Sequence, residues 1–112
     1  GVNIECLTSV SLPEIGGAWS VEIDPTQLAG TSLVSLVVRS SATGGTVLGY
    51  GEPLVAGPKL FSAGQPANAA GNVFSFPIPN DTGLVGFSAS AQAVLLGGGL
   101  TLGNALDLVV GY

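Results

Sequence analysis

The sequence lacks most of the residues that carry protein chemistry. Among its 112 residues there is one cysteine, no histidine and no methionine, and its only cations, Arg39 and Lys59, stand against seven carboxylates. Two cations cannot neutralise a run of phosphates, so the composition argues against nucleic-acid binding and against a basic membrane-surface anchor. Without histidine, and with a single cysteine, the chain cannot build the common zinc sites or a Ser-His or Cys-His catalytic pair. We therefore expect a protein that is not an enzyme and uses no metal or cofactor.

The absence of methionine also bears on processing, because the chain begins at Gly1. We expect either a mature protein whose signal peptide has been removed, which is the simpler interpretation, or a fragment of something longer. This interpretation predicts an extracellular or cell-surface location. Cys6 has no partner within the chain, so it is either a small buried side chain or half of a bridge between chains. Its place in an alternating apolar run favours burial.

A long uncharged stretch lies between Asp81 and Asp107 and must be considered as a membrane span. Its length alone would suffice. It contains the glycine triplet 97–99, however, and each glycine costs a helix about 1 kcal/mol relative to alanine. We therefore predict no membrane-spanning segment.

Glycine and proline are abundant, and they divide the chain into short apolar segments. Eighteen glycines and seven prolines fall at fairly regular intervals, and no window keeps a period of 3.6 residues. This pattern is typical of all-β sandwiches and barrels. The sequence predicts one β-sandwich domain over residues 1–112, of jelly-roll or immunoglobulin-like type, with about eight short antiparallel strands.

Alternating apolar residues indicate where those strands lie. Val2, Ile4, Cys6 and Val10 share one face of a first strand over residues 2–10. Further strands are expected at 18–24, 33–38, 46–50, 73–78, 84–96 and 100–110, with weak ones near 54 and at 59–61. Asp24-Pro25 predicts a capped turn or single helical turn, and Gly44-Gly45 a hairpin turn. In the 84–96 strand, the small polar face with Ser88, Ser90 and Gln92 is expected to lie outward.

Three motifs are distinctive. They are Leu-Pro-Glu-Ile-Gly-Gly-Ala-Trp-Ser at 12–20, Ile-Pro-Asn-Asp-Thr-Gly-Leu-Val-Gly at 78–86, and Gly-Asn-Ala-Leu-Asp-Leu-Val-Val-Gly at 103–111, with Gln92 between the last two. Together they resemble a module of secreted bacterial proteins, especially of planctomycete type, which commonly closes long extracellular polypeptides. The resemblance implies an extracellular β-sandwich with no catalytic residues. The single cysteine departs from the family pattern, so a family-type disulfide is not implied. Physically, Pro79-Asn80-Asp81 is turn chemistry, and Asn104 is expected to satisfy backbone groups at a bend.

Several acidic and amide side chains are candidates for a cation site. Glu22 and Asp24 lie two apart on one strand face and can share a cation or a proton, although a solvated acidic face is the favoured interpretation. Asn80 and Asp81 can bind calcium, but an Asx-turn is favoured because the spacing of a calcium loop is missing. Asn80-Asp81-Thr82 also matches the N-glycosylation pattern, which we interpret as a turn.

Aromatic residues are the candidates for a carbohydrate platform. Trp19, Phe74, Phe76 and Phe87 occupy apolar-face positions and are expected in the core. The residues that remain for the surface are Tyr50, Phe61 and Tyr112.

The scarcity of charge, with a mean hydropathy of +0.61, predicts self-association, because charge on edge strands normally prevents it. Our leading hypothesis is a secreted structural subunit that forms a filament or surface layer with copies of itself. In that hypothesis the segment 2–10, with Val2, Ile4, Cys6 and Val10, completes the sheet of a neighbour by strand addition. Ordinary pairing of this segment within its own sandwich is the alternative. A second hypothesis is a monomeric binding or adhesion module that recognises a glycan or another polymer.

Overall fold

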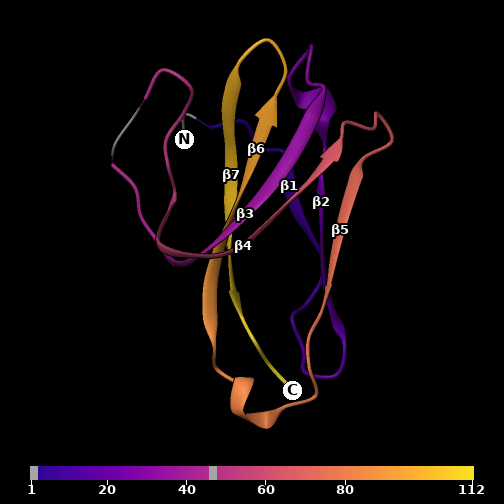
Figure 1. Ribbon diagram of the computed structural model, residues 1–112, viewed down its shortest axis with the longest axis vertical. Coiled ribbons are helices and arrows are strands. Elements are labelled where there is room, and N and C mark those ends of the chain that lie inside the picture. Colours follow the sequence, from indigo (N-terminus) through magenta and orange to yellow (C-terminus); the bar gives the residue numbers. More distant parts are fainter. Residues whose placement is uncertain (1–2, 46–47) are drawn as a thin grey trace.

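Seven antiparallel strands form two facing sheets in the computed structural model, which describes residues 3–45 and 48–112 (Figure 1). One sheet has the order β1-β2-β5 and the other the order β4-β3-β6-β7. The strands are β1 (Leu7–Ser11), β2 (Ala18–Ile23), β3 (Leu33–Ala42), β4 (Val55–Pro66), β5 (Asn72–Pro77), β6 (Ser88–Leu96) and β7 (Leu100–Val109), with 3-10 turns η1 (Pro25–Gln27) and η2 (Thr82–Leu84). The predicted all-β sandwich is confirmed, with seven strands in the described part where about eight were expected. The pairings β1-β2-β5 and β3-β6-β7 follow the order of immunoglobulin-like sandwiches.

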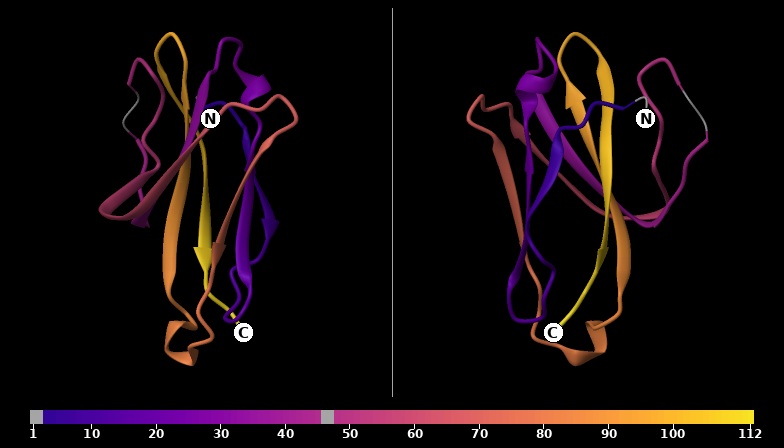
Figure 2. Two further views of the ribbon diagram at one scale, coloured as in Figure 1. Left: turned by 45° about the vertical axis from the view of Figure 1, so that its right-hand side comes forward. Right: turned by 180° about the vertical axis from the view of Figure 1, so that it is seen from behind.

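The core lies between the two sheets, which Figure 2 shows as separate layers. β2 contributes Trp19, Val21 and Ile23 to it, as the alternation of its sequence predicts. β3 contributes three aliphatic side chains, and the inward side chains of β6 are Ala89, Ala91, Ala93 and Leu95. The uncharged stretch 82–106 forms η2, β6 and most of β7. In the described ranges, no helix has the length and apolar character needed to cross a membrane.

The N-terminal segment contacts both sheets. Ile4 forms a parallel bridge with Gly103 of β7, whereas Leu7–Ser11 pairs with β2. Between these two pairings the segment crosses from one sheet to the other. There, Asn104 Oδ1 accepts hydrogen bonds from the N–H groups of Cys6 (2.8 Å) and Leu7 (2.7 Å), and its Nδ2 donates to Leu7 O (2.8 Å). The prediction that Asn104 satisfies backbone groups is confirmed, but these groups belong to the N-terminal segment, and the predicted bend is absent because β7 continues through residue 104.

The strand after β3 is not where the sequence predicts it. Residues 46 and 47 lie outside the described residues, and 48–51 form a tight turn closed by the Leu48–Gly51 bridge. β3 pairs with β4, residues 55–66, in a region where only weak strands near 54 and at 59–61 are predicted. Glycine and proline lower the strand propensity of this region. They are accommodated because β4 is an edge strand with irregular register, where proline is tolerated.

The outer face of β6 is covered at two of its three polar residues, which corrects the prediction that all three lie outward. Ser90 and Gln92 are both buried, whereas Ser88 is exposed, as predicted. Gln92 Oε1 accepts from Leu54 N (3.0 Å), and its Nε2 donates to Glu52 O (2.9 Å) and Gly103 O (3.0 Å). The connection between β3 and β4 therefore folds back over β6 at Gln92, so this side chain is not available to pack against a neighbouring molecule.

Replacing Asn104 tests how much the crossing of the N-terminal segment contributes to stability. Asn104→Ala leaves two backbone N–H groups and one carbonyl without their partner, and we expect a loss of about 2–4 kcal/mol in the free energy of unfolding. Urea unfolding followed by Trp19 fluorescence measures it. Asn80→Ala, at an exposed turn position, is the control and should change stability by less than about 0.5 kcal/mol. Equal effects of the two substitutions would contradict the assignment.

Candidate functional site

The four residues predicted to act in assembly do not share one face. Val2 lies outside the described residues. Ile4 is half-buried and packs against the core, and Cys6 is buried, as predicted. Val10, in contrast, is 59% exposed. The alternation breaks because the segment changes sheets between Ile4 and Leu7, so that Cys6 and Leu7 are both buried, and because the pairing of β1 with β2 shifts register between Ser9 and Ser11.

Cys6 packs tightly against β7. Burial raises the pKa of its thiol, and a hydrogen bond with the backbone of Asn104 opposes this rise. A Cβ at Gly103 would lie 2.7 Å from Cys6 Sγ and 3.0 Å from the Cβ of Ala93. Only glycine fits at position 103 without displacing a neighbour.

This contact predicts a coupled pair of substitutions. Gly103→Ala should lower stability by about 1–3 kcal/mol through overpacking. In a Cys6→Ala background the same change should cost distinctly less, because the sulfur atom that the new methyl group meets is gone. A double-mutant cycle by urea unfolding measures the difference. Additive effects would show that the methyl group is accommodated elsewhere.

Two of the acidic candidates, Asp24 and Asp81, act as turn caps, whereas Glu22 lies within β2. Asp24 accepts hydrogen bonds from Thr26 N (2.9 Å) and Gln27 Nε2 (3.0 Å) at the start of η1, as the sequence predicts. The Thr26 hydroxyl, and then Gln27, hold the pKa of Asp24 below its usual value. The cap therefore stabilises the fold above about pH 4 and loses its effect as the pH falls through the lowered pKa. Asp81 accepts from Gly83 N (2.9 Å), which confirms the Asx-turn. Within residues 3–45 and 48–112, no cluster of three or more potential metal ligands occurs.

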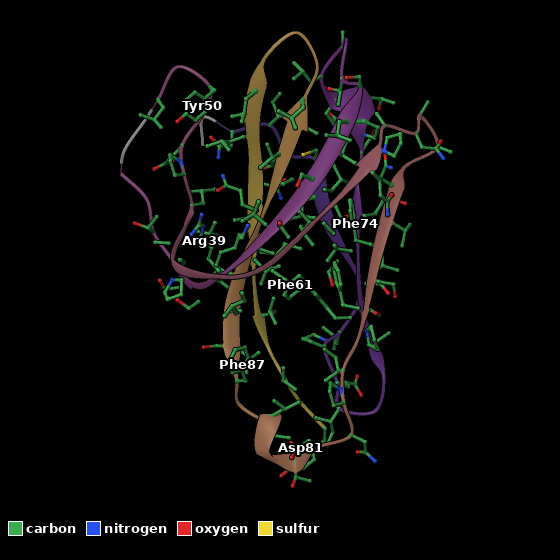
Figure 3. The ribbon with its side chains drawn as sticks, viewed as in Figure 1. Arg39, Tyr50, Phe61, Phe74, Asp81 and Phe87 are labelled. Carbon is green, nitrogen blue, oxygen red and sulfur yellow. The ribbon has the colours of Figure 1, made fainter. Side chains whose placement is uncertain are left out.

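An apolar crevice of about 190 Å³ opens between the sheets, with Phe61 and Phe87 among its lining residues (Figure 3). Every residue that lines it is apolar. Phe76 of β5 is one of them, and its ring centroid lies 5.7 Å from that of Trp19 of β2 and 4.8 Å from that of Phe61 of β4. Phe61 is exposed, as predicted, but Phe87 is 48% exposed and not in the core. The reason is that Phe87 lies just before β6, beyond the Arg39–Ser90 pair at which the pairing of β3 with β6 ends.

A strand position beside the crevice is empty. β3 pairs with β6 only as far as the Arg39–Ser90 pair, and then continues beside β4 alone. β6 and β7 remain paired down to Ser88 and Val109. Ser88 therefore has β7 on one side and, within the described part of the chain, no strand on the other. β5 faces the same opening as the edge strand of its sheet.

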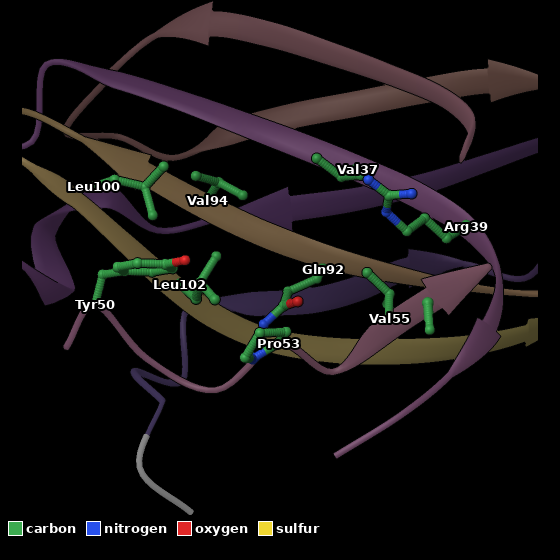
Figure 4. A pocket seen from close by; sticks show the side chains of 10 residues that line it. Val37, Arg39, Tyr50, Pro53, Val55, Gln92, Val94, Leu100 and Leu102 are labelled. Atoms are coloured by element: carbon green, nitrogen blue, oxygen red, sulfur yellow. The ribbon is translucent and has the colours of Figure 1, made fainter. Parts of the chain in front are cut away.

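A larger groove of about 600 Å³ lies on the outer face of the four-stranded sheet (Figure 4). Its floor is made by β3, β6 and β7, including Val37, Gln92 and Leu102, and its wall by residues 50–56. Tyr50 lies at one end and Arg39 at the other (Figure 4). Tyr50 is 46% exposed, which agrees with its prediction as a surface aromatic. Arg39 is the one charged residue among those that line the groove.

A bulge in β4 shapes both hollows. Val38 pairs with Phe61, but Arg39 pairs with Lys59, so that Leu60 is an extra residue in β4. Leu60 and Phe61 both line the crevice. Arg39 and Lys59, the two cations of the chain, are brought opposite each other on the β3–β4 ladder. Sequence reasoning missed this pairing, because regular register would place Leu60 opposite Arg39.

Comparisons of the chain with protein-family models, with curated proteins and with solved structures find no match.

Proposed function

We propose that this chain is a secreted structural subunit that assembles with copies of itself into an extracellular filament or surface layer. The observation that carries the proposal is the apolar crevice beside the unpaired end of β6. An added strand at this place would gain backbone hydrogen bonds from the edge of β6, and its alternate side chains would fill the crevice. The resemblance of the three sequence motifs to a secreted module supports the extracellular location.

The occupant we propose is the Val10–Leu12 segment of a second copy. Val10 and Leu12 are 59% and 69% exposed and lie two residues apart, so both can point into one crevice. Val10 belongs to β1, which forms one edge of the β1-β2-β5 sheet, whereas the crevice lies at the β5 edge. A contact between opposite edges of one sheet joins different surfaces of the two copies. Such contacts propagate into rings or open filaments and do not stop at a dimer.

A charge placed at the crevice should block assembly. Phe87→Lys puts an ammonium group where apolar side chains must pack, and we expect the particles seen by light scattering and negative-stain electron microscopy to be lost. Val73→Lys is the matched control, because Val73 has the same 48% exposure as Phe87 and does not line the crevice. Assembly of both variants, or a wild-type chain that is monomeric at every concentration, would overturn the proposal.

A second experiment separates docking from exchange of the whole N-terminal strand. Thr8 and Glu22 are cross-strand partners in β1 and β2, so the double variant Thr8→Cys/Glu22→Cys should form a disulfide. We expect a single-chain band on a non-reducing denaturing gel, because Leu7 and the Asn104 bonds hold β1 in its own sandwich. A covalent ladder would instead show that residues 2–10 are donated to a neighbour. Ser20→Cys/Ser75→Cys is the control, since the two hydroxyl oxygens lie 2.7 Å apart on β2 and β5.

The alternative function, a monomeric binding or adhesion module, is favoured by one observation, the outer groove with Tyr50 at its mouth. Such a module would stay monomeric on concentration and would be retained on a glycan column.

A further inference from the structure

The outer groove combines three features that stability alone does not explain. The first is the position of the two cations: Arg39 lines the groove, and Lys59, which is not among the lining residues, is its direct cross-strand partner. Like charges opposite each other on a sheet destabilise it. A chain with net charge −5 and only two cations nevertheless brings them together. The bulge at Leu60 creates this pairing, and bulges are frequent beside functional sites because they re-aim side chains.

The second feature is that a backbone carbonyl holds the guanidinium of Arg39 in place, and no carboxylate occurs among the described residues that line the groove. Its Nη1 donates to Gly57 O (3.0 Å), which uses one of its five N–H donors. Its two cross-strand partners are Lys59 and Ser90, and none of the residues lining the groove is acidic. Asp107, one strand beyond Ser90, accepts a hydrogen bond from the Ser90 hydroxyl (2.7 Å) and is not among the lining residues. The guanidinium is thus positioned to receive an anion from the groove.

The third feature is the apolar surface at the other end of the groove. Tyr50 lies beside Leu100 and Leu102 there (Figure 4), and Val94 of β6 extends the floor. An aromatic ring beside an apolar floor fits the apolar face of a sugar ring, while its hydroxyl remains in water. The volume of about 600 Å³ is in the usual range for ligand sites.

Together these features point to one class of ligand, and we infer that the groove binds an acidic polysaccharide. A sugar ring packs on Tyr50 and the apolar floor, and a carboxylate or sulfate of the same chain accepts hydrogen bonds from Arg39, with Lys59 adding a second positive charge. The negative net charge of the chain does not prevent this, because at physiological ionic strength charges more than about 8 Å away are largely screened. The groove lies on the outer face of the β4-β3-β6-β7 sheet, whereas the crevice lies between the sheets, so this inference is independent of self-assembly.

Isothermal titration calorimetry of the wild-type chain with hexagalacturonate, a sulfated chondroitin hexasaccharide and neutral maltohexaose tests the inference. We expect binding of at least one acidic probe, no binding of maltohexaose, and a severalfold loss of affinity between 50 and about 200 mM salt. These wild-type measurements need no variant. Failure of both acidic probes to bind, or equal binding of maltohexaose, would overturn the inference.

Variants then locate the site. Arg39→Gln and Tyr50→Ala should each weaken binding of the acidic probe at least tenfold while leaving the light-scattering profile of the chain unchanged. Tyr112→Ala is the matched control, because Tyr112 is exposed and does not line the groove. Binding that is insensitive to both groove substitutions would place the ligand elsewhere and refute the assignment. Loss of assembly in Phe87→Lys, with glycan affinity retained, would show that the two surfaces act separately.

Discussion

The hydrogen bonds of one side chain, that of Asn104, hold the two ends of this fold together. The amide joins β7 to the backbone of Cys6 and Leu7, at the point where the N-terminal segment crosses from one sheet to the other. Where a backbone passes from one sheet to the other, its N–H and C=O groups have no neighbouring strand to pair with. They must then form hydrogen bonds with other groups. Asn104 supplies both an acceptor and a donor there, which lets Cys6 and Leu7 enter the core side by side. Gly103 contributes to the same arrangement, because a side chain at position 103 would overlap the sulfur atom of Cys6.

Local patterns predicted the parts of this structure that local physics determines. The alternation in β2 and the caps by Asp24 and Asp81 follow from a few neighbouring residues. The wrong predictions concern residues whose burial depends on segments far away in the sequence. Gln92 is buried because residues 52–54 fold over it, and the residues next to Gln92 in the sequence do not predict this long-range contact. Val10 is exposed because the segment before it changes sheets.

The candidate sites divide in the same way. The exposure of Tyr50 and Phe61 could be predicted, because Trp19, Phe74 and Phe76 fall on apolar strand faces. The same reasoning failed for Phe87, which lies outside β6 and is exposed. The pairing of Arg39 with Lys59 could not, since it depends on the register of β4. Glycine and proline lower the strand propensity of β4, so the sequence does not predict it clearly. Irregular backbone near Lys59 is seen at Gly57, which has a positive φ of 79°.

The structure also explains how a chain with so little charge protects its edges. β4 carries Pro58, Lys59 and two shifts of register, and β5 ends at Pro77, so neither edge offers a long regular ladder. β1 is interrupted by its own irregularity between Ser9 and Ser11. At these three edge strands, backbone geometry thus takes the place that charged side chains have in most β proteins. The fourth edge strand, β7, carries a charge, that of Asp107.

The extra residue in β4 has a consequence for how this chain can vary. Leu60 adds apolar surface to the crevice between the sheets, and because it is the extra residue of the bulge, Lys59 and not Leu60 pairs with Arg39. Deleting Leu60 would restore regular register at this point and would keep Lys59 opposite Arg39, but it would remove an apolar side chain from the crevice. Homologous chains that lack a residue here should therefore keep the cation pair and differ in the crevice, so that the crevice can vary while the pair on the outer face stays the same.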